Sequence, residues 1–283
     1  MSCTNPIMIK ANDGSGYMMV PCGKCIGCRL DKARDYSVRL ANEKRLYDDS
    51  VFITLTYDDE HMPEDMSIHK SEVQKFLKLV RKRIYPEKIR YFLCGEYGDQ
   101  FGRPHYHLIV FNLSMFDERV FTAHQKAAGG YVVLCSCWDK GRVHVGNVTR
   151  ASASYVARYT MKKVNGHPKE WYQDKGIEPE FILMSLKPGI GFGFMDKYKE
   201  DILNHDAVYV DGVKFRVPRY YFKKLNLSDT IGYEIKSNQK HQEYFDNFES
   251  MSSGSYLQSG LKKAQEREQR ARNNKKFMEQ KGR

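Results

Sequence analysis

A chain of 283 residues with 41% hydrophobic and 13% aromatic residues is long and apolar enough to bury a sizeable core, which excludes a largely disordered protein. Its formal net charge of +11 indicates a polyanionic partner such as nucleic acid, although a solvated basic surface gives the same excess. Residues 261–283 hold nine Lys/Arg against three Glu, which is more than half of this excess.

The sequence shows no sign of a membrane-bound or secreted protein. No apolar run reaches the roughly 18 residues of a transmembrane helix, and the first residues lack the apolar core of a signal peptide. Seven cysteines, an odd number, favour reduced thiols over a disulfide framework. We therefore expect no membrane partner and a protein that works in a cytosol.

A cysteine-containing segment is predicted at the start of the chain. Cys22, Cys25 and Cys28 follow the pattern Cys-x2-Cys-x2-Cys, with glycines between them that let the backbone turn around a common point. Three thiolates of this spacing suggest a structural Zn²⁺ site, with Cys3 as the candidate fourth ligand. An iron–sulfur site and a turn with buried free thiols are the alternatives.

The remaining elements are predicted from apolar runs for strands and from apolar residues at helical spacing for helices. Ser71-x-x-Gln74 is a capping-box pattern that opens one of the helices. The predicted elements are a helix over 29–47, a strand over 51–57, a helix over 71–85, strands over 89–94 and 104–111, a helix over 115–125, strands over 131–134 and 143–148, and a helix that begins at Ser152 or Ser154 and reaches Lys163.

This order predicts an α+β fold with a ferredoxin-like split βαβ antiparallel sheet, in which the first and third strands lie centrally. A hairpin around Asp211-Gly212 is predicted further on. The predicted domain organisation is a Cys-containing N-terminal segment over 1–47, a core over 48–185, a C-terminal accessory region over 186–254, and a basic tail over 255–283 with a helix over 257–281.

His105 and His107 stand at the head of the strand over 104–111 and are the first candidate site residues. Side chains two apart on a strand share a face and are about 6.5–7 Å apart along it, so the two imidazoles can converge on one divalent ion. A pair of satisfied surface histidines is the plain alternative. The third strand is central in the predicted sheet, so the pair is expected at mid-sheet.

An acidic residue is expected to complete this set. If the strands over 89–94 and 104–111 form a hairpin, Glu96 lies across from His105. Two histidines and one carboxylate with open positions suit Mg²⁺ or Mn²⁺. Asp99 is the rival for this place.

Tyr155 and Tyr159 are one helical turn apart, with Arg158, Lys162 and Lys163 around them. Two phenols on one helical face are usually packing groups. Beside a pair of metal-binding histidines and a cationic cluster, however, a tyrosine oxygen can attack a DNA phosphodiester whose phosphate the metal polarises.

These motifs carry a family resemblance. His105-Tyr106-His107 resembles the His-hydrophobic-His signature of the HUH endonucleases, Phe52–Tyr57 resembles the strand motif before it, and the two tyrosines match the family's two-tyrosine motif. Three further segments look like those of replication initiators of gokushovirus-type microviruses, which are single-stranded DNA phages: Pro21–Arg29, Lys187–Gly191 and Pro218–Tyr221.

The resemblance implies an endonuclease and strand transferase that starts rolling-circle replication in the cytoplasm of a bacterial host. It would act on single-stranded DNA at the replication origin through a 5′-phosphotyrosyl intermediate and hand a 3′-hydroxyl to the host replication machinery. Glu96 best matches the acidic or polar position that the family places upstream of its histidines. Lys162 or Lys163 would stabilise the charge on the phenolate or the leaving oxygen.

Two other functions fit part of the pattern. A plasmid relaxase or transposase would use the same site. A non-catalytic, zinc-containing nucleic-acid-binding protein would fit the cysteines and the basic tail but leaves the paired histidines and tyrosines without a role.

Overall fold

The computed structural model describes residues 3–10, 16–98, 102–165, 169–225 and 269, without the side chains of residues 18, 19 and 159–165. The chain divides into two compact units. One consists of residues 1–35 and 217–283, and the other of residues 36–216. Each unit is described by itself.

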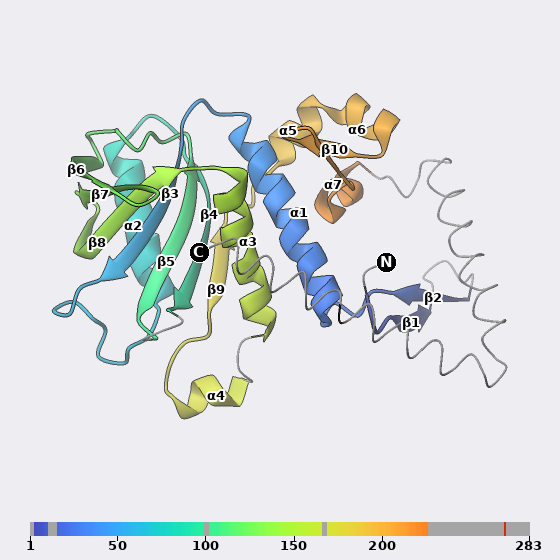
Figure 1. Cartoon of the computed structure of the whole chain (residues 1–283), viewed down its shortest axis with the longest axis horizontal. Coiled ribbons are helices and arrows are strands. Elements are labelled where there is room, and N and C mark those ends of the chain that lie inside the picture. Colours follow the sequence, from blue (N-terminus) through green and yellow to red (C-terminus); the bar gives the residue numbers. More distant parts are fainter. Residues whose placement is uncertain (1–2, 11–15, 99–101, 166–168, 226–268, 270–283) are drawn as a thin grey trace. The chain divides into compact units, whose positions relative to one another are not determined.

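A seven-stranded antiparallel sheet forms the centre of the larger unit, so the protein is a mixed α+β protein as predicted (Figure 1). The strands lie in the order β6-β7-β8-β3-β5-β4-β9, and every neighbouring pair is antiparallel. The strands are β3 (Ser50–Tyr57), β4 (Arg90–Tyr97), β5 (Pro104–Phe111), β6 (Phe121–Ala127), β7 (Gly130–Cys135), β8 (Trp138–Asn147) and β9 (Phe181–Met184).

The strands predicted as first and third, β3 and β5, are neighbours near the middle of this sheet. The helix predicted over 115–125 is wrong, because this stretch forms turns that lead into β6. The Asp117 carboxylate accepts the backbone N–H of Arg119 and pairs with its guanidinium, and local bonds of this kind compete with a helix. Phe116, expected to point inward, is 55% exposed. The second crossover helix of the predicted ferredoxin-like order is therefore replaced by the β6–β7 hairpin.

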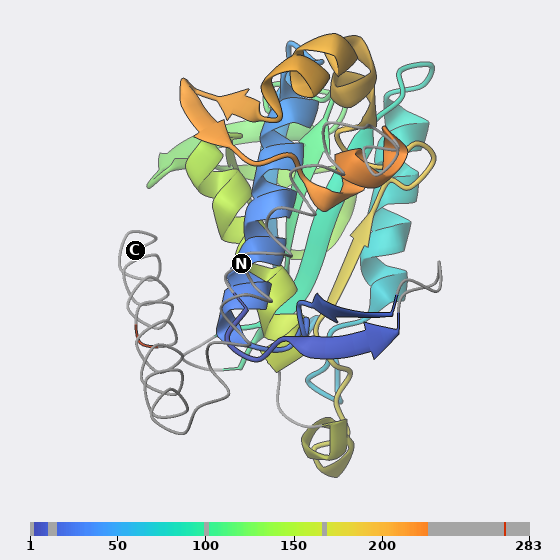
Figure 2. The same ribbon diagram turned by 90° about the vertical axis from the view of Figure 1, so that its right-hand side faces the viewer.

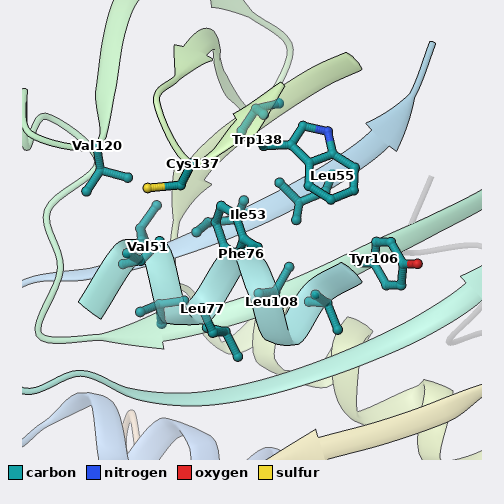
Figure 3. Close-up of a cluster of buried hydrophobic side chains, with 14 of the residues drawn as sticks. Val51, Ile53, Leu55, Phe76, Leu77, Tyr106, Leu108, Val120, Cys137 and Trp138 are labelled. Carbon is teal, nitrogen blue, oxygen red and sulfur yellow. The ribbon is translucent and has the colours of Figure 1, made fainter. Parts of the chain in front are cut away.

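Helix α2 (Lys70–Arg83) covers one face of the sheet, where it packs on apolar side chains that alternate along β3 and β5 (Figure 3). The predicted capping box at Ser71 is wrong, since the helix begins after His69 without a side-chain cap. The Tyr106 hydroxyl accepts the His69 N–H and donates to the His69 carbonyl, which holds this residue in an extended conformation. Tertiary contacts thus set the start of α2.

The opposite face is covered by α3 (Arg150–Asn165) and by α1 (Ile26–Lys44) from Tyr36 onward (Figures 1 and 2). The remaining side chains of β3, β4 and β5 point toward these helices. The buried cluster on this face consists of Leu40, Phe92, Cys94, Ile109, Phe111, Val148, Ala153, Val156, Ala157 and Ile190. The His pair and the tyrosine helix therefore lie on the same side of the sheet.

Short elements make up the rest of the described chain. The hairpin predicted around Asp211-Gly212 is confirmed, and both residues have positive φ, 49° and 75°. The predicted helix over 257–281, like most of the basic tail over 255–283, lies outside the described residues. The other elements are β1 (Ile7–Lys10), β2 (Tyr17–Val20), α4 (Lys169–Asp174), α5 (Phe192–Lys197), α6 (Lys199–His205), β10 (Val208–Val210), β11 (Val213–Phe215) and α7 (Arg219–Lys224).

None of the helices within the described ranges combines the length and apolar character that crossing a lipid bilayer requires.

Candidate metal and tyrosine site

His105, His107 and Glu96 come together on the face of the sheet that α3 covers. The register of β4 and β5 places Glu96 directly opposite His105, so the predicted hairpin is confirmed. Glu96 and His107 are 3% and 6% exposed, which is unusual for such polar groups unless they are paired or bind a cation. Asp99, the rival acidic residue, lies outside the described residues.

The three side chains converge on one point. Glu96 Oε1 lies 2.9 Å from His105 Nε2 and 3.0 Å from His107 Nε2. Two bonds of about 2.1 Å from a cation, at right angles to each other, separate their ligand atoms by about 3.0 Å. The spacing therefore fits two edges of an octahedral Mg²⁺ or Mn²⁺ site.

The outer nitrogen of each imidazole has a partner that fixes the ring. His105 Nδ1 lies 2.9 Å from the Arg103 carbonyl oxygen and must donate to it, because a carbonyl only accepts. In the neutral ring, Nε2 then presents a lone pair to the Glu96 carboxylate. These two acceptors repel each other unless a proton or a metal cation lies between them, so the geometry selects a positively charged occupant.

The partners of His107 come from β3, and sequence reasoning did not find them. Thr54 Oγ1 lies 3.0 Å from His107 Nδ1, and the Phe52 ring stacks on the imidazole at 5.8 Å with a 15° interplanar angle. Both residues alternate with buried side chains along β3, and the β3–β5 register pairs Thr54 with His107. That alternation, combined with a sheet order, is the signal that could have found them.

Tyr155 reaches the site from the first turns of α3. Its ring meets the His107 ring edge-on, with centroids 5.3 Å apart, and the Phe52 ring at 6.3 Å. The Arg158 guanidinium lies over the Tyr155 ring at 5.5 Å. The structure thus brings one tyrosine and one cation of the predicted cluster beside the metal ligands.

The other predicted residues of this cluster, Tyr159, Lys162 and Lys163, belong to the helical backbone of α3, but their side chains lie outside the described part.

Helix α3 begins earlier than predicted. Only Val148 and Thr149 separate the end of β8 from Arg150, the first residue of the helix. Thr149 Oγ1 accepts the Ser152 N–H at 3.1 Å, while Ser152 Oγ accepts the Thr149 N–H at 2.8 Å. This reciprocal pair caps the helix, so Thr149 and not Ser152 or Ser154 is the residue before its first turn.

The four predicted zinc ligands form a second group of potential metal ligands, in the smaller unit. The sulfur atoms of Cys3, Cys22, Cys25 and Cys28 all lie within 4.8 Å of one another, and none is in a disulfide. Burial acts to raise the pKa of the Cys25 thiol, but backbone hydrogen bonds from Cys28 and Thr4 outweigh it and lower the pKa to about 6. Cys25 is therefore the thiol that most readily becomes a thiolate.

Comparison with known proteins covers the site just described. Residues 50–164, from β3 to α3, match the model of the replication-associated protein ORF2 family. No solved structure shows a significant match to the chain.

Three phage proteins are similar over most of this chain. Replication-associated protein VP4 of Bdellovibrio phage phiMH2K is 33% identical over 236 residues, which are 79% of this chain and 73% of the relative. Replication-associated protein ORF2 of Spiroplasma virus 4 is 36% identical over 73% of this chain and 67% of its own length. Replication-associated protein ORF4 of Chlamydia phage 1 is 27% identical, and the match spans 71% of this chain but about half (52%) of the relative. The resemblance predicted from the motifs is confirmed, and the chain belongs to the replication-associated protein ORF2 family, with relatives in microvirus-type phages.

Proposed function

We propose that the protein is an HUH endonuclease that initiates rolling-circle replication of a small DNA genome. It nicks one strand at the origin, stays joined to the 5′ end through a phosphotyrosyl bond, and later rejoins the ends. The observation that carries this proposal is the convergence of Glu96, His105 and His107 beside Tyr155, in a member of a replication-associated family. The central strands β3 and β5, with both histidines on β5, support assigning residues 48–185 to an HUH core.

Glu96, His105 and His107 would hold the catalytic cation, Mg²⁺ or Mn²⁺. When bound, such a cation neutralises phosphate charge and polarises the scissile phosphodiester. Three protein ligands leave positions open for phosphate oxygens and water. The Arg103 carbonyl and Thr54 keep the two Nε2 atoms directed at the site, so little reorganisation is needed.

The phenol of Tyr155 or Tyr159 is the nucleophile. Its oxygen forms a bond to phosphorus while the bond from phosphorus to the 3′ oxygen breaks. The phenol loses its proton to solvent, and the leaving oxygen takes one up to become the 3′-hydroxyl that the host replication machinery extends. An unperturbed phenol has a pKa of about 10, so activation is required. Cationic side chains on α3, namely Arg158, Lys162 and Lys163, supply it by stabilising the phenolate or the leaving oxygen.

Two tyrosines allow the reaction to repeat. Tyr155 and Tyr159 are one helical turn apart on α3, so each can reach the same phosphate by a side-chain rotation. When replication regenerates the origin, the second tyrosine attacks it, and the released 3′-hydroxyl closes the displaced strand into a circle. The covalent link thus passes from one tyrosine to the other without free DNA ends.

A relaxase or transposase would use the same groups, but the family match favours an initiator. A non-catalytic DNA-binding protein would give the buried Glu96 and the two converging imidazoles no task.

The deciding experiment is covalent capture. Single-stranded oligonucleotides that tile the genome encoding this chain are labelled at the 3′ end, incubated with the protein and Mn²⁺, and resolved under denaturing conditions. We expect one oligonucleotide to transfer its label to the protein, and the adduct to disappear with EDTA and with His107→Ala. His205→Ala, at an exposed histidine on α6, is the matched control and should form the adduct. DNA binding without any adduct would leave the non-catalytic function standing.

A further inference from the structure

The four cysteine sulfurs of the smaller unit enclose a single point, and we propose that they hold one structural Zn²⁺ as thiolates, with Arg29 as the counter-charge of the site. The proposed nuclease chemistry does not use this group. Its ligands come from the start of the chain, from the stretch after β2 and from the first turn of α1.

The distances between the sulfur atoms match a tetrahedral thiolate site. Four Zn–S bonds of about 2.3 Å at tetrahedral angles separate the sulfurs by about 3.8 Å. Cys3 Sγ lies 3.6 Å from Cys22 Sγ and 3.9 Å from Cys25 Sγ, and Cys22 Sγ lies 4.0 Å from Cys28 Sγ. A disulfide requires about 2.05 Å, so the thiols are spaced for a shared ligand and not for bonds to each other.

Backbone N–H groups point at the sulfurs. The N–H groups of Cys22, Cys25 and Cys28 donate to Cys3 Sγ, Cys22 Sγ and Cys25 Sγ at 3.3, 3.4 and 3.5 Å. The N–H of Thr4 donates to Cys25 Sγ at 3.5 Å. Donors to sulfur stabilise the thiolate over the thiol and fix its orientation, as the outer groups around metal ligands do.

Arg29 supplies positive charge next to this group. Its Nε–H is buried and has no hydrogen-bond partner within the described ranges, which is rare for a guanidinium. Burial lowers the pKa of Arg29, whereas the nearby thiolates of Cys25 and Cys22 raise it. A zinc ion with four thiolates carries a net charge of −2, and a buried cation beside it offsets part of that charge. The metal site therefore gives the otherwise unexplained Nε–H a purpose.

The metal would also replace a hydrophobic core. All four residues of β1 are exposed, so the β1–β2 hairpin does not bury its own first strand. A hairpin of two short strands is marginal alone in water. Binding one ion to Cys3, Cys22, Cys25 and Cys28 ties both ends of this hairpin to the start of α1, as structural zinc does in small domains.

Metal content tests the zinc site separately from the nuclease. Full-length protein without an affinity tag is analysed by inductively coupled plasma mass spectrometry. We expect about one zinc per chain, retained in His107→Ala and lost in Cys25→Ser. Co²⁺ substitution of the unmutated protein should give the thiolate charge-transfer and visible bands of a tetrahedral site, which guards against a variant that merely misfolds. Folded protein without zinc, or with iron in its place, overturns the zinc assignment whether or not DNA is cleaved.

Variants of Arg29 test the counter-charge. Arg29→Met keeps the length of the side chain and removes the charge, so we expect about tenfold or weaker zinc binding by chelator competition. The pH at which half of the zinc is released should rise, because protons then compete better for the thiolates. Arg29→Lys should restore both values, and Arg34→Met, at a side chain that is 49% exposed on the same helix, should change neither. Unchanged affinity and release pH in Arg29→Met would refute the role of this residue.

Discussion

Replacing Thr54 by valine should weaken metal binding at the Glu96–His105–His107 site without changing the fold. Valine has nearly the same shape and suits a strand, but it removes the hydroxyl that lies 3.0 Å from His107 Nδ1. Once Nε2 binds a cation, Nδ1 carries the proton, and in the variant this buried donor has lost its acceptor. Loss of such an outer partner costs about 10–100-fold in metal affinity, or roughly 1.4–2.7 kcal/mol.

The assay is a Mn²⁺ titration of adduct formation, alongside direct Mn²⁺ binding measured by electron paramagnetic resonance. The half-saturating concentration should rise by the predicted factor in Thr54→Val, while the rate at saturating Mn²⁺ stays near that of the unmutated protein. Thr54→Ser should restore affinity. Thr56→Val, two residues along the same face of β3, is the matched control for the binding measurement. An unchanged Mn²⁺ requirement in Thr54→Val would mean that Thr54 does not orient His107.

Three other outcomes are expected. Tyr155→Phe and Tyr159→Phe should each still form some covalent adduct but release no unit-length circles, and the double variant should form none; complete cycles by one single variant and none by the other would leave a single nucleophile. Deleting residues 255–283 should weaken single-stranded DNA binding and flatten its dependence on salt by about 0.7 in log–log slope per lost phosphate contact, while adduct formation survives at low salt; an unchanged slope would assign the tail another role. Burial raises the pKa of Glu72, but the Lys140 ammonium outweighs it and lowers the pKa below 4.5, so this carboxylate stabilises the fold above that pH and the stability is lost as the pH falls through the lowered value. Glu72→Gln should therefore be less stable at pH 7 by about 1 kcal/mol in urea unfolding, and the difference should vanish in acid; a gap that persists there would point to packing.

Most of the sheet could be predicted from the sequence, because its strands carry strong local signals. The apolar run after His107, the alternation over 51–57 and the helical spacing over 71–85 each depend only on neighbouring residues. The failures arose where distant contacts decide. The spacing of Phe116, Val120 and Phe121 fits a helix, but pairing between β6 and β7 overrides it.

The candidate site divides in the same way. His105, His107 and Glu96 were found because residues on one strand or across one hairpin have fixed spatial relations. Thr54 and Phe52 contact His107 only because β3 lies beside β5, and that strand order follows from the whole sheet. Cys3 is separated by 19 residues from Cys22, and the hairpin between them brings the two sulfurs together.

The two-residue connection between β8 and α3 bears on the fate of the DNA after the nick. A helix capped at Thr149 and packed through Val156 and Ala157 cannot swing away from the sheet, so a DNA end joined to Tyr155 stays next to the place where it was cut. The rejoining step then involves two groups on one rigid body, with an effective concentration far above that of free ends in solution. On this view, the shortness of the connection keeps the genome from being released as a broken linear strand.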